Sequence, residues 1–412
     1  MKQTEVGLIP DDWEVKTLGE IGEPCMGKRI LKEQTSSTGD VPFYKIGTFG
    51  GIPDAFISRE LFEQYKEQYN YPKKGTLLLS AAGTIGRVVV FDGKDSYFQD
   101  SNIVWIDNDE TKVTNDFLFY CYSRMQWKTE EGGIVSRLYN ANLKSTSFIA
   151  PKSLAEQERI AKALSDVDAL ISTTEKLIQK KKNIKQGAMQ NLLTGKKRLP
   201  GFGDKQTDLF VPNGTHTKEV KDVSPEQIRL SAKMKQTELG EIPEDWEVKS
   251  LGEMLKIGHG KDYKNLKSGN VPVYGTGGYM TSVNDFLYEG ETVCIGRKGT
   301  IDKPQYHSGK IWTVDTLFYT YDFKSLNPKY LFYKFCLIDW LSMNEASGVP
   351  SLTAKNIEDI QITIPTEEEQ TAIANVLSSM DKEIETLNTK LEKYRNLKTA
   401  MMQQLLTGKI RL

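Results

Sequence analysis

The sequence lacks the features of a secreted, membrane or metal-binding protein. It has four cysteines among 412 residues, with no CxxC pair, and three scattered histidines. These residues do not have the spacing of a zinc site, and such isolated cysteines are typical of reduced thiols in a cytoplasm. No run approaches the ~20 consecutive apolar residues of a membrane span, and the N-terminal segment has no apolar signal-peptide core. We therefore expect a cytoplasmic protein without a bound metal and without a membrane partner.

An excess of basic residues is also missing. Lys and Arg total 54 against 55 Asp and Glu, which gives a formal net charge of −1. A strongly basic chain would indicate nucleic-acid binding. The balanced charge neither supports nor excludes DNA as a partner.

Recognisable catalytic motifs are absent as well, since the sequence contains no GxxxxGK[ST], HExxH or GxSxG pattern. The segment PDDWEVK at residues 10–16 resembles the PD…ExK set of metal-dependent nucleases. Asp11 and Glu14 are too close in the chain to reach one metal from separate strands, and Glu244 replaces Asp11 in a second copy of the segment. We interpret the segment as a turn and a strand anchored by Trp13.

A second catalytic resemblance has an equally simple explanation. The sequence NPKY at 327–330 resembles the NPP-aromatic loop of amino-methyltransferases, although Lys329 replaces its second proline. Asn327 as a helix N-cap, followed by Pro328 at the first helical position, accounts for the same residues. We therefore predict no catalytic residues in this chain.

What the sequence does contain is an internal repeat. Residues 1–21 match residues 234–254 at 16 of 21 positions without a gap. Residues 155–199 match residues 368–412 at 21 of 45 positions, also without a gap. Each half therefore has a preserved beginning, a preserved end and a divergent middle.

The divergent middles share a weak common pattern. VPFYKIG at 41–47 faces VPVYGTG at 271–277, and TLLLSAAGTIG at 76–86 faces TVCIGRKGTID at 292–302. Short β-rich runs alternate with Gly and Asp in both middles, and one helix-like stretch follows them. These helix-like stretches are residues 115–127 and 328–341. The pattern predicts two α+β domains, each with a twisted, partly antiparallel sheet.

Each half ends in a long helix with a heptad pattern of apolar residues. At about 1.5 Å per residue, ~40 residues make a rod of roughly 60 Å. Lys398 interrupts the second pattern, and Thr174, Lys181 and Lys185 interrupt the first. The predicted helix–helix seam consists of Ile160, Leu164, Val167, Ile171, Ile178, Leu192, Ile373, Leu377, Met380, Ile384, Leu387, Leu391 and Leu405. Both helices end in LLTGK, where Gly195 and Gly408 suit helix C-caps.

Two copies of one unit, each with a seam-bearing helix, are expected to pair those helices about an approximate two-fold axis. The predicted fold class is therefore α+β: two pseudo-two-fold-related α+β domains separated by a long antiparallel two-helix coiled coil. The predicted boundaries are 1–152 and 234–366 for the domains, 153–197 and 367–412 for the helices, and 198–233 for a polar linker.

The repeated motifs resemble those of the specificity subunits of type I restriction–modification systems. These motifs are IPxDWEVKxLGE at the start of each half, EQxxIAxxL at Glu156–Leu164 and Glu369–Leu377, and LLTGKxRL at both ends. The resemblance covers nearly the whole chain. It implies that each middle is a target-recognition domain that reads one half of a bipartite, gapped site in double-stranded DNA. The helices would then set the spacing between the two halves and dock the modification subunits.

The same resemblance implies partners and places catalysis in them. Two modification subunits would bind S-adenosylmethionine and methylate adenine, and restriction subunits would use ATP and Mg²⁺ to translocate and cleave DNA. This chain would itself be a non-catalytic recognition subunit without a cofactor. Two alternatives stay open on the sequence: a stand-alone methyltransferase or nuclease with an unrecognised site, and a coiled-coil scaffold that binds only proteins.

Candidate DNA-binding residues are those that can contact base edges or phosphates. Arg pairs well with guanine, Asn and Gln pair with adenine, and Lys, Arg and backbone amides bind phosphates. The candidates are Lys28, Arg29, Lys45, Arg87, Arg137 and Tyr139 in the first middle, and Lys261, Lys264, Tyr274, Arg297, Lys298 and Lys355 in the second. The alternative for each cation is a solvated surface charge.

One of these segments differs between the two copies. Arg297 and Lys298 lie in IGRKGT between two glycines, where a backbone can approach closely. The first copy reads LSAAGT, with Ala81 and Ala82 in their place. We interpret the remaining lysine-rich runs, KKK at 180–182 and KKR at 196–198, as solvated helix faces or as complements to a helix dipole.

Overall fold

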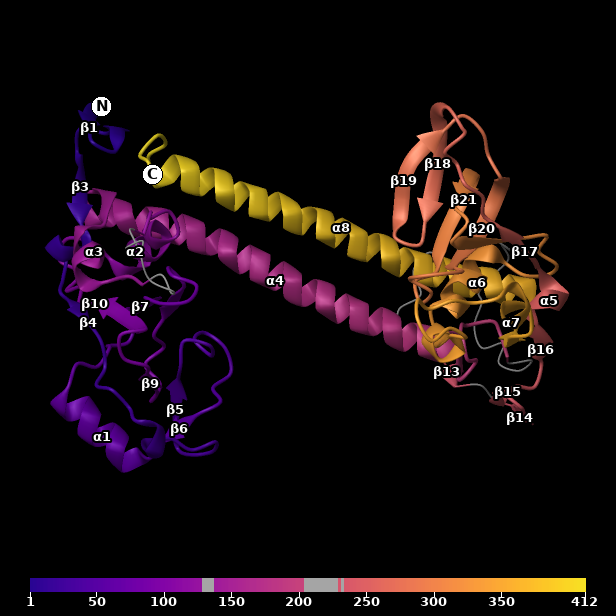
Figure 1. Ribbon diagram of the computed structural model, residues 1–412, viewed down its shortest axis with the longest axis horizontal. Helices are drawn as coiled ribbons and strands as arrows, with labels where there is room; N and C mark the ends of the chain where they lie inside the picture. Colours follow the sequence, from indigo (N-terminus) through magenta and orange to yellow (C-terminus); the bar gives the residue numbers. More distant parts are fainter. Residues whose placement is uncertain (128–136, 204–228, 231–232) are drawn as a thin grey trace, which may run out of the picture. The chain divides into compact units, whose positions relative to one another are not determined.

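The computed structural model describes residues 1–127, 137–203, 229–230 and 233–412. They form two compact units, which we call unit 1 (Met1–Thr174 and Lys390–Leu412) and unit 2 (Glu175–Thr389). Each unit contains one of the two middles together with parts of both long helices, α4 (Leu154–Leu192) and α8 (Glu367–Leu405) (Figure 1). Helices and strands are mixed in both units, which confirms the predicted α+β class.

Unit 1 is built from small antiparallel sheets and one parallel strand pair. Two two-stranded sheets are β1 (Lys2–Thr4) with β2 (Gly7–Ile9), and β3 (Trp13–Thr17) with β11 (Ser147–Pro151). A four-stranded antiparallel sheet has the order β4 (Pro24–Cys25), β10 (Ile103–Ile106), β7 (Leu77–Ser80), β8 (Val88–Val90). A three-stranded sheet has the order β6 (Phe56–Ile57), β5 (Val41–Tyr44), β9 (Tyr97–Phe98), with β5 and β9 parallel. The short helices are α1 (Arg59–Gln68), α2 (Asn115–Tyr122) and α3 (Asn140–Ser145).

Unit 2 has a larger sheet. Its six strands have the order β17 (Lys256–His259), β22 (Leu317–Tyr321), β20 (Tyr288–Gly296), β21 (Gln305–Thr313), β18 (Ser268–Gly275), β19 (Gly278–Val283), with β18 and β21 parallel. Three two-stranded sheets are β14 (Met234–Thr237) with β15 (Gly240–Pro243), β16 (Glu247–Ser250) with β23 (Gln361–Ile364), and β12 (Lys197–Arg198) with β13 (Arg229–Leu230). The short helices are α5 (Leu251–Met254), α6 (Pro328–Phe335) and α7 (Ala354–Glu358).

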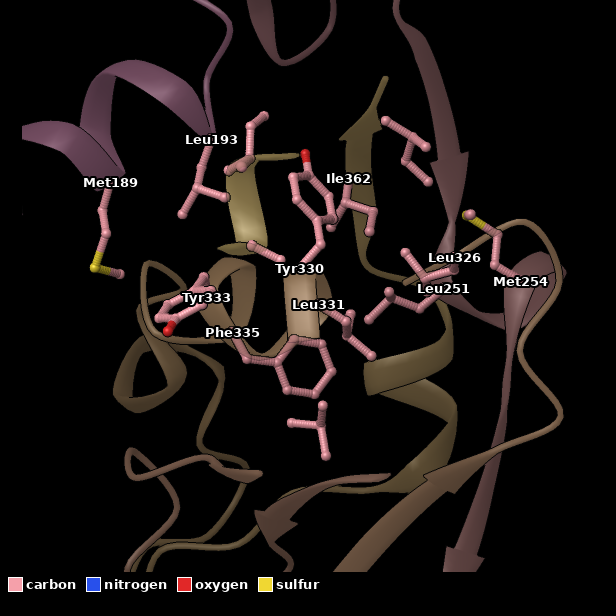
Figure 2. Packing of buried hydrophobic residues seen from close by; sticks show 14 of the residues in the cluster. Met189, Leu193, Leu251, Met254, Leu326, Tyr330, Leu331, Tyr333, Phe335 and Ile362 are labelled. Atoms are coloured by element: carbon pink, nitrogen blue, oxygen red, sulfur yellow. The ribbon is translucent and has the colours of Figure 1, made fainter. Parts of the chain in front are cut away.

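Helix α6 lies at the centre of the apolar core of unit 2. Tyr330 and Leu331 are fully buried there, in the same apolar cluster as Met189 of α4 and Leu193, which directly follows α4 (Figure 2). Asn327 caps the helix by accepting hydrogen bonds from the N–H groups of Lys329 (2.9 Å) and Tyr330 (3.0 Å), which confirms the predicted N-cap. The core therefore joins the second middle to the C-terminal end of the first long helix.

The two helix-like stretches are shorter than predicted. Helix α2 ends at Tyr122 and α6 at Phe335, although the apolar pattern continues in both. In unit 2 that pattern is carried by a 3₁₀ turn at Trp340–Met343, and the indole of Trp340 packs against Phe335 with ring centroids 5.0 Å apart. The pattern reports burial correctly, but it does not require one continuous helix.

Each preserved helix end is held by a cluster of charged residues around a buried glutamate, Glu156 in unit 1 and Glu369 in unit 2. In unit 2 the guanidinium of Arg198, 5% exposed, donates to the carboxylates of Glu369 (2.9 Å) and Asp245 (2.7 and 2.9 Å). In unit 1 Arg411 donates in the same way to Glu156 and to Asp12. The expectation that the cations at 196–198 are solvated or complement a dipole is therefore wrong for Arg198.

We call each of these clusters, with the contacts beside it, a joint. In each joint the glutamate is followed by a glutamine. The side chain of that glutamine accepts a hydrogen bond from the residue directly before a short helix of the same unit, α2 in unit 1 and α6 in unit 2. Gln157 accepts from the N–H of Thr114 (2.8 Å) and donates to the carbonyl of Pro151 (2.9 Å), and Gln370 accepts from Asn327 (2.8 Å). The repeated EQ pair thus fixes each long helix to its own domain, while the repeated arginine fixes the end of the other helix.

The lysines that interrupt the heptad pattern form ion pairs within each unit. In unit 1 Lys398 pairs with Asp168 (2.6 Å), which also accepts from the hydroxyl of Tyr120 (3.0 Å). The ammonium of Lys398 lies 5.7 Å from the Tyr120 ring centroid. The same contacts recur in unit 2 between Lys185, Asp381 and Tyr333. Within each unit the two helix segments are therefore antiparallel.

Seam residues near the helix ends belong to the domain cores. Ile160, Leu164 and Leu405 lie in the core of unit 1, and Leu192, Ile373 and Leu377 lie in that of unit 2. Of the remaining seam residues, Val167, Ile178 and Leu391 are buried, while Ile171, Met380, Ile384 and Leu387 are half-buried. The seam residues near the helix ends therefore pack on the domains as well as in a helix–helix contact.

The predicted linker begins with two buried residues, Arg198 and Leu199. Most of it, residues 204–228 and 231–232, lies outside the described residues. Over the ranges that are described, no helix combines the length and apolar character that crossing a bilayer requires.

Candidate nucleic-acid interface

In unit 2 four of the predicted DNA-binding residues meet at one turn, residues 314–316 between β21 and β22. The N–H of Arg297 donates to Thr316 (2.8 Å), and its guanidinium donates to the carbonyl of Asp315 (3.2 Å). The carbonyl of Tyr274 accepts from Val314 (3.0 Å). The N–H of Lys298 donates to Thr316 (3.3 Å), and that of Lys261 donates to Thr313 (2.8 Å), the last residue of β21, directly before the turn.

Unit 1 has an equivalent turn at residues 99–102, between β9 and β10. The N–H of Gln99 donates to Tyr44 (2.9 Å), as that of Val314 does to Tyr274. Arg29 pairs with Asp100 (2.9 Å) and Arg137 donates to the side chain of Asn102 (3.0 Å). Two of the predicted arginines of the first middle therefore converge on the turn that corresponds to 314–316.

We call these two segments the recognition turns. Each follows a strand that pairs in parallel with the VPxY strand, β5 in unit 1 and β18 in unit 2. The N–H of Ala81 bonds Asn102 (2.8 Å) as that of Arg297 bonds Thr316. The first recognition turn has one residue more, and Ser101 there adopts φ of 54°, a left-handed conformation unusual for serine.

The two units bring an arginine to the recognition turn from different elements. Ala81 is fully buried, whereas Arg297 at the corresponding position is exposed. The carbonyls of both accept an N–H from a neighbouring segment, from Leu138 (2.8 Å) and Leu352 (2.9 Å). In unit 1 that neighbouring segment supplies the cation, Arg137. The two units therefore share the same backbone hydrogen bonds, but the arginine comes from the position aligned with Ala81 in unit 2 and from the segment bonded to Ala81 in unit 1.

The other cations of the first middle have partners of their own. The ammonium of Lys28 lies 5.0 Å from the Tyr69 ring centroid, and its backbone N–H donates to the hydroxyl of Tyr97 (2.8 Å). Lys45 pairs with Asp54 (2.9 Å). Lys28 is thus bonded to β9, the strand before the first recognition turn, and Lys45 directly follows β5, the parallel neighbour of β9.

Arg87 and the three remaining candidates are less directly connected. The guanidinium of Arg87 donates to the carbonyl of Phe49 (2.9 Å). Tyr139, half-exposed, precedes α3, and Lys355 on α7 pairs with Asp359 (2.7 Å). Lys264 lies 3.8 Å from Asp262 within its own loop.

Sequence reasoning missed a cleft beside Tyr274, the residue whose carbonyl bonds Val314 of the second recognition turn. Its volume is about 670 Å³, and its lining includes Tyr274, Tyr279, Lys303 and His307. His307 stacks on Tyr274 with ring centroids 3.7 Å apart, and burial lowers its pKa to about 4, so it is neutral at pH 7. The alternation of β21 could have placed Gln305 and His307 on one face, but a single histidine carried no further signal.

Comparison with known proteins identifies the class to which this architecture belongs. The family model of the type I restriction modification DNA specificity domain matches the chain twice, at residues 10–185 and 243–393. These matches cover more than half of the chain, and the chain belongs to this family. The resemblance inferred from the repeated motifs is thereby confirmed.

Individual relatives agree with this family. A putative type I restriction enzyme specificity subunit, MjaX, from Methanocaldococcus jannaschii is 27% identical over 458 residues, covering 100% of this chain and 96% of the relative. A putative specificity subunit from Haemophilus influenzae is 58% identical over 160 residues, which are 39% of this chain and 41% of that protein. The crystal structure of an S subunit from M. genitalium has the same fold, with a TM-score of 0.61 and 16% identity over 98% of both chains.

Proposed function

We propose that each unit reads one half of a bipartite, gapped DNA site through the surface around its recognition turn. The observation that carries this proposal is that the two recognition turns share the same backbone hydrogen bonds but have different cations beside them. Both units hold the same turn by the same backbone bonds, yet one presents Arg29 and Arg137 and the other Arg297 and Lys298. A common scaffold with different donors at its surface is what two readers of different sequences require.

Membership of the specificity-subunit family supports a proposal about the partners and the chemistry of this chain. We propose that two modification subunits bind this chain, carry S-adenosylmethionine and methylate adenine in both half-sites. Restriction subunits would add ATP- and Mg²⁺-dependent translocation and cleavage. The chain itself acts without a cofactor of its own, in the cytoplasm where its DNA lies. Its net charge of −1 fits this role, since the partners can supply part of the surface that binds phosphates.

We further propose that α4 and α8 set the distance between the half-sites. Two readers on one side of B-DNA favour a separation near one helical turn, roughly 34 Å. Inserting one heptad into both helices should lengthen the gap in the recognised sequence and leave each half-site unchanged. An unaltered gap would contradict this role of the helices.

A domain exchange tests the assignment of one half-site to each unit. Replacing residues 22–150 with the corresponding domain of another specificity subunit should change only one half of the methylated sequence. A change in both halves, or in neither, would contradict the proposal. The purified chain alone should show no turnover with Mg²⁺, ATP and S-adenosylmethionine, whereas activity without partners would indicate a stand-alone enzyme.

A further inference from the structure

The most exposed apolar side chains of the two units lie at equivalent points of the repeat. Among the described residues, Ile52 is 89% exposed and Tyr279 is 64% exposed, the two highest values for a large apolar side chain. Ile52 lies on the loop that joins β5 to its antiparallel neighbour β6, and Tyr279 lies directly after the turn that joins β18 to its antiparallel neighbour β19. We call residues 46–53 the first tip and residues 275–281 the second tip.

The two tips share a sequence pattern within middles that otherwise diverge. The first reads GTFGGI at 47–52 and the second reads GTGGYM at 275–280, so the exposed residue directly follows a Gly-Gly pair in both. One glycine of each pair has positive φ, 76° at Gly50 and 105° at Gly278, a conformation that favours glycine. Because glycine has no side chain, another molecule can also approach the backbone closely there. Each tip therefore presents one apolar side chain beside a bare backbone.

Each tip is attached to the recognition turn of its own unit. In unit 1 the N–H of Ile46 donates to the side-chain carbonyl of Gln99, the first residue of the recognition turn (2.9 Å). In unit 2 the carbonyl of Tyr274, directly before the tip, accepts the N–H of Val314, the first residue of that turn (3.0 Å). The two exposed side chains therefore belong to the surfaces that we propose to face DNA.

Further contacts hold both tips in place. In unit 1 Phe49 is buried in the domain core, and its carbonyl accepts from the guanidinium of Arg87 (2.9 Å). In unit 2 the side-chain amide of Gln305 donates to the carbonyls of Gly275 (2.9 Å) and Thr276 (3.3 Å). Binding through a segment that is already ordered costs less conformational entropy than binding through a free loop. The tips are therefore suited to insertion into a partner.

The chemistry of the tips favours contact with bases over contact with phosphates. Neither tip contains a charged residue. Phosphate groups attract Lys and Arg side chains, whereas apolar side chains such as Ile, Leu, Met and Phe are inserted between neighbouring base pairs by many DNA-binding proteins. An aromatic ring can stack on a base in the same gap. Ile52 and Tyr279 both belong to these types.

The exposed apolar surface at each tip is one side chain rather than a patch. Ile52 is flanked in the chain by Gly51 and Pro53. Met280 is also exposed, but it follows Tyr279 within β19, and successive side chains of a strand point to opposite faces. A protein interface needs a contiguous surface, whereas the gap between two base pairs accepts a single side chain. The geometry therefore favours DNA over a protein as the occupant.

We propose that Ile52 and Tyr279 are wedges, each inserted between two neighbouring base pairs of the half-site that its unit reads. This proposal rests on the proposed function, because it takes the recognition turns to face DNA. Insertion unstacks one base step in each half-site. Extrusion of a base for methylation costs unstacking energy, so a step that is already unstacked lowers that cost. The wedges thus add local opening of the duplex to the sequence readout by the recognition turns.

The test is the fluorescence of 2-aminopurine in duplexes that carry the motif methylated by the assembled complex of this chain and its modification subunits. 2-Aminopurine replaces the purines of each half-site one at a time, apart from the methylated adenine, and its fluorescence rises where stacking is lost. The wild-type complex should give a rise in both half-sites. Tyr279→Ala should abolish it only in the half-site of unit 2, and Ile52→Ala only in that of unit 1. Tyr279→Ala should also weaken binding roughly 5- to 100-fold without changing the motif, and Ile52→Ala should act in the same direction.

Matched variants separate insertion from other effects of substitution. Ile52→Met and Tyr279→Phe keep a side chain that can be inserted, and the fluorescence rise should persist in both. Leu170→Ala and Leu177→Ala remove exposed leucines of α4, one in each unit, and should change neither fluorescence nor affinity. Unchanged thermal unfolding of each variant shows that the substitution acts locally.

Three other results would overturn the wedges in distinguishable ways. A rise that persists in the double Ile52→Ala, Tyr279→Ala variant, with the gapped motif and its affinity unchanged, would overturn them and leave the proposed function intact. Weaker assembly with the modification subunits and an unchanged rise would assign the tips to a protein contact instead. A complex that recognises no gapped motif would overturn the proposed function, and the wedges with it.

Discussion

The guanidinium of Arg411 donates two hydrogen bonds to the carboxylate of Asp12, at 3.0 and 2.6 Å, across 399 residues of sequence. The equivalent pair in unit 2 is Arg198 with Asp245, across 47 residues. In both units the arginine follows the end of one repeat's long helix, and its carboxylate partner belongs to the beginning of the other repeat. Neither half of the sequence therefore contains a complete joint.

Removing the arginine of the joint in unit 2 should destabilise that unit strongly. Glu369 has no exposed surface, so Arg198→Ala leaves a buried carboxylate without its partner, at a cost of about 3–5 kcal/mol. Burial opposes the charge of Asp245, but hydrogen bonds from Arg198 outweigh it and lower the pKa of that carboxyl. The free energy of unfolding from urea denaturation measures the loss. Lys249→Ala, which removes an exposed pair with Glu247, should change it by less than about 1 kcal/mol, and an equal effect of both would contradict the role of the joint.

Gly195, in the turn that follows α4, should not tolerate a side chain. Gly195 has φ of 70°, and a Cβ there would lie 2.5 Å from Cδ of Pro243. Gly195→Ala should therefore lower the free energy of unfolding by about 2 kcal/mol or more. Gly187, within α4, is the control, because a Cβ there meets no atom within 4 Å outside its own helix turn. Gly187→Ala should raise stability by roughly 0.5–1 kcal/mol, and a loss at both sites would contradict the packing described.

A buried lysine should make the stability of unit 2 depend on pH. Burial lowers the pKa of Lys334 from 10.5 to about 7, although its ammonium donates to the carbonyl of Leu193 (3.0 Å) and to Thr363 (2.8 Å). The unfolded chain keeps this proton up to about pH 10.5 and the folded chain releases it near pH 7. Between these values the unfolded state binds more protons, so stability rises with pH.

Substitution of Lys334 isolates this contribution. Lys334→Met should remove the rise between about pH 7 and 10.5, measured as urea midpoints at each pH. Lys382→Met changes an exposed lysine of α8 and should keep the rise. A pH dependence that persists unchanged in Lys334→Met would show that another group causes it.

The recognition turns should determine the two half-sites independently. Arg137→Ala should alter one half of the recognised sequence and Arg297→Ala the other, because each guanidinium lies at the turn of a different unit. For an arginine that contacts a base edge directly, the loss is about 1–3 kcal/mol at one base position. Binding of the assembled complex to duplexes with single substitutions measures it. Uniform weakening on every sequence would make the residue a phosphate contact instead.

The fold could be predicted to the extent that its signals are local. Heptad spacing indicated both long helices, and repeated motifs indicated two similar units. The joints were not predicted, because Arg198 lies in a run of cations, whose usual environment is solvent, and Glu369 is 171 residues away. The lysines within the heptad pattern were interpreted as interruptions, because the usual environment of a lysine side chain is solvent. Their partners, such as Asp168 for Lys398, become neighbours only when the helices pair.

The candidate site could be predicted by residue type but not by arrangement. Aligning the two middles placed Ala81 opposite Arg297, and the backbone bonds of both units agree with that alignment. The meeting of Arg29 and Arg137 at one turn depends on a parallel pairing of β5 with β9 that no local pattern encodes. His307 was missed because its partner, Tyr274, lies on another strand.

The central claim is that this chain directs methylation to a two-part DNA sequence. Its most direct test is single-molecule sequencing of DNA from cells that express the chain with its modification partner. We expect one gapped motif with methylated adenine in both halves, and a change in only one half when Arg297 is replaced by alanine. An assembled, active complex that methylates a continuous motif, or shows no sequence preference, would contradict it.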